Sequence, residues 1–106
     1  FALNNLAYFL AFDDPNEGLV FAQQAAKLAP DNATVEDTLG WVYYRCGMYS
    51  AATICLKGAF AKQPSASTQY HLAMSYLKAG YQEIGREALR AALERDPNLP
   101  KTEQGW

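Results

Sequence analysis

The sequence repeats itself at a fixed spacing. The segments LAYFL, LGWVY and LAMSY begin at Leu6, Leu39 and Leu72, so each is offset from the previous one by 33 residues. A period of this size is typical of stacked repeat proteins, in which each unit buries its apolar face only against its neighbours. The sequence therefore predicts an array of repeated units rather than one mixed core.

Each repeat reads as a pair of helices. Apolar residues recur at spacings of three and four, as in Leu3, Leu6, Ala7 and Leu10, and no segment alternates as a strand would. Turn-forming residues interrupt this pattern at 13–16, 30–32, 47, 63–65, 80 and 96–98. These breaks predict six helices of about 12–15 residues, and the short linkers predict that neighbouring helices pack antiparallel. Asp14 followed by Pro15 predicts a helix N-cap with proline at the first helical position.

The second helices repeat as well. The shared positions are Gly18, Ala22, Ala25 and Pro30, then Ala52, Leu56, Ala59 and Pro64, then Gly85, Leu89, Ala92 and Pro97. With the Leu-Gly pair at Leu39 and Gly40 and the tyrosine at Tyr43, this pattern resembles the tetratricopeptide repeat family. Two features depart from the family: Leu10 replaces the tyrosine in the first repeat, and the signature tryptophan is missing from all three, with Glu36 and Gln69 in its place in the second and third. The segments DTLGWVYYRCGMYSAA and YHLAMSYLKAG look like bacterial members associated with exopolysaccharide export and PEP-CTERM protein sorting.

The resemblance implies an all-α fold, a right-handed α-solenoid of three antiparallel helix hairpins. The repeats would cover about 1–32, 33–65 and 66–98, which together form one domain over 1–98. Residues 99–106, ending in Trp106, would form a C-terminal cap or begin a truncated fourth repeat. Three repeats are about the minimum for a stable stack.

Gly40 interrupts an apolar run, although glycine costs a helix about 1 kcal/mol relative to alanine. In the family this position is where the first helix of a repeat is crossed most closely by the second helix. Ala7 and Ala73 are its equivalents, and the small residues on the opposing helices are Gly18, Ala52 and Gly85. We therefore expect Gly40 to be structural.

Trp41, the residue after Gly40, points away from the contact between the two helices of its repeat. In the family, the first helices line a concave groove, and the matching positions here include Trp41. The resemblance assigns to the groove Asn4, Tyr8, Ala11, Phe12, Thr34, Asp37, Trp41, Tyr44, Arg45, Ser67, Tyr70, Met74, Leu77 and Lys78. Aromatic side chains next to arginine are typical of binding hot spots. We expect a groove for a peptide or helix with apolar anchors and an acidic group facing Arg45 and Lys78.

One alternative for the groove is that Tyr8, Trp41 and Met74 pack on one another across adjacent repeats. A chaperone-tail clamp is disfavoured, because the positions that would hold its lysines and asparagines carry residues such as Asn4, Tyr8, Thr38, Ser67 and His71.

Sequence features of catalysis are missing. No phosphate loop, nucleophile elbow or pair of catalytic carboxylates is found. His71 is the single histidine, and we expect it to serve on the polar surface or in a hydrogen bond between repeats. Cys46 and Cys55 lack metal-binding spacing and are expected to be free thiols. We therefore predict a non-enzyme without metal or cofactor.

The net charge and the hydropathy of the chain limit the classes of partner that it is expected to bind. A net charge of −2 argues against nucleic acid, and no apolar run is long enough to span a membrane. The sequence predicts a protein-interaction scaffold whose groove binds a peptide or helix of a partner. The alternative is a self-association module, such as a homodimer formed through the ends or the groove. The cell compartment is not indicated.

Overall fold

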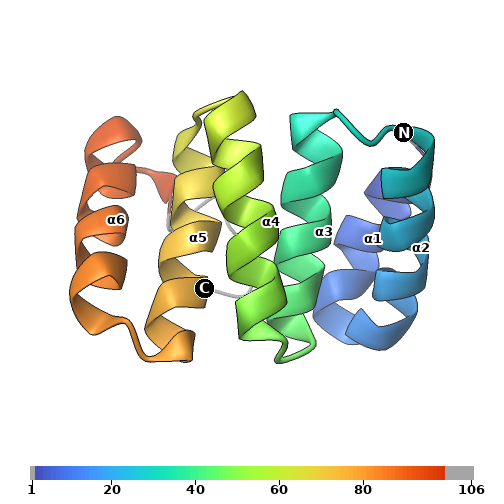
Figure 1. Ribbon diagram of the computed structural model, residues 1–106, viewed down its shortest axis with the longest axis horizontal. Helices are drawn as coiled ribbons and strands as arrows, with labels where there is room; N and C mark the ends of the chain where they lie inside the picture. Colours follow the sequence, from blue (N-terminus) through green and yellow to red (C-terminus); the bar gives the residue numbers. More distant parts are fainter. Residues whose placement is uncertain (1, 100–106) are drawn as a thin grey trace.

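The computed structural model describes residues 2–99, and within that range the chain forms six α-helices and no strand. The helices are α1 (Ala2–Asp13), α2 (Pro15–Leu28), α3 (Ala33–Arg45), α4 (Tyr49–Lys62), α5 (Ala66–Ala79) and α6 (Gln82–Arg95) (Figure 1). This confirms the all-α class and the six helices. None of the helices in this range is both long enough and apolar enough to cross a bilayer.

The helix ends follow from residues with special backbone or side-chain chemistry. Asp14 caps α2 by accepting a hydrogen bond from the backbone N–H of Glu17, and Pro15 opens the helix as predicted. Asn32 and Ser65 cap α3 and α5 in the same way. Gly80 ends α5 with a φ of 99°, in the left-handed region that glycine enters without steric cost.

The helices pack as three hairpins, α1 with α2, α3 with α4 and α5 with α6, arranged side by side along the long axis (Figure 1). Neighbouring hairpins meet through α2–α3 and α4–α5, and α3 also touches α1 and α5. The sequence period is kept in space, because α3 and α5 start 33 residues apart, at Ala33 and Ala66, and so do α4 and α6, at Tyr49 and Gln82.

The apolar core is divided among neighbouring helices. One cluster joins Ala7, Ala11, Ala22, Trp41 and Val42, a second joins Ala52, Leu56 and Leu72, and a third joins Tyr70, Ala92 and Leu99. The first cluster joins the first and second hairpins, the second cluster joins the second and third, and the third cluster lies between α5, α6 and the residues after α6. Leu99 is 2% exposed and closes the third cluster, whereas Trp106 lies outside the described residues.

Gly40 lies where α3 meets α4, and the structure confirms that a close approach requires it. A Cβ atom there would lie 2.6 Å from Cγ of Leu56 and 3.2 Å from Cβ of Cys55. The nearest neighbour is therefore Leu56, not Ala52. In the first hairpin Gly18 does face Ala7, with 3.1 Å between its ideal Cβ position and the Ala7 carbonyl oxygen.

Glu36 occupies the position where the tetratricopeptide family has tryptophan. Its Oε1 lies 2.7 Å from Nζ of Lys62. This ion pair joins the start of α3 to the end of α4.

Candidate functional site

The first helices of the three hairpins border an open cleft of about 670 Å³. α1 contributes Asn4, Asn5, Tyr8, Phe9, Phe12 and Asp13, α3 contributes Thr34, Asp37 and Thr38, and α5 contributes Ser67 and His71. These eleven residues are called the cleft below. Because α3 touches both α1 and α5, side chains far apart in the sequence reach one surface.

The cleft contains only part of the predicted groove. Asn4, Tyr8, Phe12, Thr34, Asp37 and Ser67 line it. The other five cleft residues, Asn5, Phe9, Asp13, Thr38 and His71, were not among the predicted groove positions. On α1, the unpredicted residues lie one residue after the predicted ones, so the cleft spreads over a wider face of that helix than the family positions imply.

Trp41 and Tyr70 require a correction, since both were expected to project into the groove. Trp41 is 3% exposed and Tyr70 is 1% exposed, so neither offers surface to a ligand. The indole stacks between Tyr44, with ring centroids 4.8 Å apart, and His71, at 4.3 Å. The cause is the close approach of α5, whose imidazole covers the indole.

The alternative, in which Tyr8, Trp41 and Met74 pack together, describes the observed arrangement. Tyr8 and Met74 are partly buried and pack against the cluster that contains Trp41. Tyr44 is partly buried too, and burial raises the pKa of its hydroxyl. Trp41 therefore joins adjacent hairpins, from α1 through α3 to α5.

The two predicted cations, Arg45 and Lys78, do not face the cleft together. Nε of Arg45 donates a hydrogen bond to the carbonyl oxygen of Ala11 at 3.2 Å, and its guanidinium lies 5.5 Å from the ring centroid of Phe12. Arg45 thus satisfies a carbonyl at the C-terminal end of α1, where a cation is favoured. Lys78 lines a different hollow, next to Gly47 and Tyr49. Neither Arg45 nor Lys78 lines the cleft, so the cleft does not offer the pair of cations that was expected to face an acidic group.

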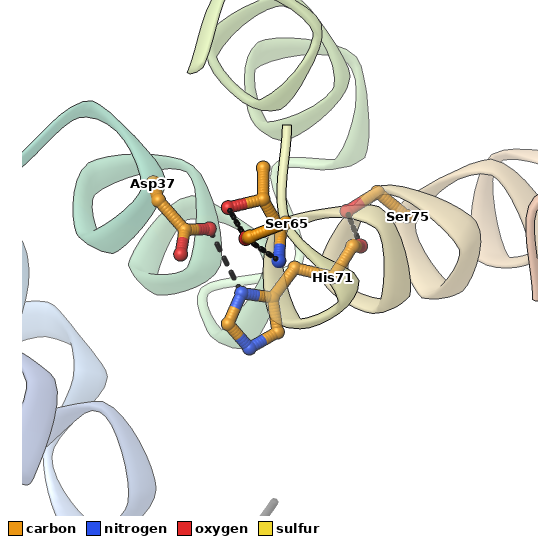
Figure 2. A network of polar contacts seen from close by, with 5 residues as sticks. Asp37, Ser65, His71 and Ser75 are labelled. Atoms are coloured by element: carbon orange, nitrogen blue, oxygen red, sulfur yellow. Dashed lines mark hydrogen bonds and ion pairs between the residues drawn. The ribbon is translucent and has the colours of Figure 1, made fainter. Parts of the chain in front are cut away.

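A buried polar pair forms one wall of the cleft. Nδ1 of His71 lies 2.8 Å from Oδ1 of Asp37, with side-chain exposures of 1% and 17% (Figure 2). The hydrogen bond joins α5 to α3, which confirms the expected bond between repeats and excludes a place for His71 on the polar surface. Within α5, the hydroxyl of Ser75 donates to the carbonyl oxygen of His71 at 3.0 Å.

Sequence reasoning missed the carboxylate partner of His71 because it considered only residues on the same helix. Asp37 and His71 are 34 residues apart, which is one repeat plus one residue. In a stacked array, that separation places them at adjoining positions of consecutive first helices. The repeat period was the signal that could have revealed the pair.

The cysteines are free thiols, as predicted. Sγ of Cys46 donates to the carbonyl oxygen of Pro15 at 3.3 Å. Burial raises the pKa of both thiols, and for Cys55 the nearby Glu36 carboxylate adds to the effect. A raised pKa leaves less of the reactive thiolate at neutral pH. Across residues 2–99, no three His, Cys, Asp or Glu side chains gather closely enough to hold a metal ion.

The sequence matches no protein-family model, and no curated protein matches it either.

Proposed function

We propose that this chain is a non-catalytic interaction module that binds an extended segment of a partner protein in the cleft. The observation that carries the proposal is the cleft itself, an open hollow of about 670 Å³ bordered by one helix from each hairpin. Its walls combine aromatic rings with amides, hydroxyls and carboxylates. Such mixed linings suit a peptide, because rings supply contact area while polar groups pair with its backbone.

We further propose that the three hairpins are tetratricopeptide-like repeats that stack as a right-handed solenoid. The 33-residue spacing between the starts of equivalent helices in the second and third hairpins supports this. The buried small residues support it too, since Ala7, Gly40 and Ala73 recur on the first helices and Gly18, Ala52 and Gly85 on the second. In this architecture, the first helices line the concave surface, where extended ligands bind.

The proposal is tested by selecting peptides from a random display library on the wild-type chain and then measuring their affinities for variants. Thr34→Trp places a large ring in the cleft at an exposed position without changing charge. Gln24→Trp is the matched control, because Gln24 is exposed on α2 and does not line the cleft. We expect Thr34→Trp to weaken binding by about ten-fold or more, with Gln24→Trp close to wild type. Equal affinities for all three proteins would reject the cleft as the binding surface.

Self-association is the second candidate, and one observation favours it. Leu6 and Phe9 lie three residues apart on one side of α1 and are 41% and 66% exposed. Adjacent apolar side chains of this kind often mark contact surfaces. Leu6 does not line the cleft, so Leu6→Glu separates the two candidates. Sedimentation equilibrium of a self-associating chain would show an oligomer that Leu6→Glu dissociates, whereas a peptide-binding monomer would be unaffected.

A further inference from the structure

We propose that the segment bound in the cleft is basic, with lysine or arginine side chains reaching the carboxylates of Asp13 and Asp37. This inference rests on the proposed function and adds the chemical class of the partner. It reverses the acidic ligand that the sequence predicted.

The charges of the cleft have one sign. Among the eleven residues that line it, Asp13 and Asp37 are acidic and none is lysine or arginine. Arg45 does not line the cleft, although its guanidinium lies 5.5 Å from the ring centroid of Phe12, which does. Its Nε donates to the carbonyl oxygen of Ala11. A basic ligand therefore meets attraction in the cleft, while an acidic ligand meets two carboxylates.

Asp13 lies at the junction of two helices, as the last residue of α1 and the residue before Asp14, the N-cap of α2. The end of α1 disfavours a negative charge and the start of α2 favours one. The last turn of α1 contains no basic side chain of its own. A cation from a partner would therefore pair with a carboxylate that α1 itself leaves without a basic neighbour.

One polar atom at the wall of the cleft is an acceptor without a donor. Asn4 is 5% exposed, and its Oδ1 is buried without a hydrogen-bond partner among the described residues. Asn4 lines the cleft and also a smaller apolar hollow between α1 and α2. Oδ1 of Asp37 is hydrogen-bonded to Nδ1 of His71. Buried acceptors are normally satisfied, so the unpaired Oδ1 of Asn4 marks an acceptor at the wall of the cleft that the described residues leave without a donor.

The aromatic side chains complete the environment for a cation. Phe9 is 66% exposed beside Asp13, and Tyr8 and Phe12 pack edge to face with centroids 5.9 Å apart. The guanidinium of Arg45 already lies over Phe12, which leaves the exposed ring of Phe9 for a cation of the ligand. Rings next to carboxylates favour arginine and lysine, whose charge interacts with both.

The test uses fluorescence anisotropy with two labelled peptides. In one, arginine alternates with alanine and leucine, and in the other glutamate replaces every arginine. The variants are Asp13→Asn in the cleft, Glu87→Gln as a control with the same change in net charge, and Thr34→Trp as a block. Glu87 is exposed on α6 and does not line the cleft.

We expect the arginine peptide to bind and the glutamate peptide to bind at least about ten-fold more weakly. Asp13→Asn should weaken the arginine peptide by about three-fold, the size of one lost exposed ion pair. Glu87→Gln should leave its affinity unchanged, and Thr34→Trp should weaken binding by about ten-fold or more.

Two results would overturn the basic ligand while leaving peptide binding in place. In the first, the glutamate peptide binds more tightly than the arginine peptide, and Thr34→Trp still blocks its binding. In the second, Asp13→Asn and Glu87→Gln weaken the arginine peptide equally, and Thr34→Trp still blocks its binding. Binding of the arginine peptide that Thr34→Trp does not affect would overturn both the basic ligand and the cleft as the binding surface. So would the failure of both peptides to bind.

Discussion

Replacing Gly40 by alanine is expected to destabilise the protein, although alanine is the better helix former. The added methyl carbon would lie 2.6 Å from Cγ of Leu56 and 3.2 Å from Cβ of Cys55. Leu56 is completely buried, so its branch point has no free space into which to move. Overpacking costs about 1–3 kcal/mol, while the improved helix propensity recovers about 1 kcal/mol. The expected net loss in the free energy of unfolding is therefore about 1 kcal/mol.

Urea unfolding followed by far-UV circular dichroism measures this change, and a double-mutant cycle assigns it to the contact. Leu56→Ala alone should cost about 2–5 kcal/mol. In that background, Gly40→Ala should become stabilising by up to about 1 kcal/mol, because the space above residue 40 has been cleared. The two substitutions should therefore be coupled by about 2 kcal/mol. A Gly40→Ala protein at least as stable as wild type, or an equal effect in both backgrounds, would refute the close approach of α3 and α4.

Three further predictions follow from other contacts. Ser65→Ala removes the N-cap of α5 and should lower the free energy of unfolding by about 1 kcal/mol, whereas equal urea midpoints would contradict the cap. Asp37→Ala removes the carboxylate that is hydrogen-bonded to His71 and should lower the free energy of unfolding by about 1.5–3 kcal/mol in the same assay. A smaller loss than that caused by Ser65→Ala would show that the Asp37–His71 pair contributes little to stability. Because burial raises the pKa of Cys46 and Cys55, both should react with a disulfide reagent at neutral pH more slowly in the folded chain than in urea. Equal rates would contradict that burial.

The helix boundaries could be predicted because local chemistry sets them. Asp14 and Pro15 start α2 through a side-chain cap and a fixed φ, and both signals act within one turn of the chain. The role of Gly40 was also predictable, since a glycine within a helix implies that something packs closely against it. The identity of that neighbour, Leu56, was not predictable, because it depends on how α4 is positioned along α3.

The surface of the cleft was less predictable for a physical reason. Helical spacing gives the direction of Trp41 from its own axis but not the distance to the next helix, and His71 from α5 covers the indole. Arg45 was expected to face a ligand, yet the end of α1 lies close enough to accept its hydrogen bond. Both errors come from contacts between hairpins, which no single repeat encodes.

The central claim is that the first helices of the hairpins form the surface that binds a partner segment. It is tested most directly by recording amide chemical shifts of the nitrogen-15-labelled chain during titration with the arginine peptide. If the segment binds in the cleft, we expect the largest shifts at the side-chain amides of Asn4 and Asn5 and at the backbone amides of Thr34 and Ser67. Shifts concentrated on α2, α4 and α6, with these groups unchanged, would contradict it.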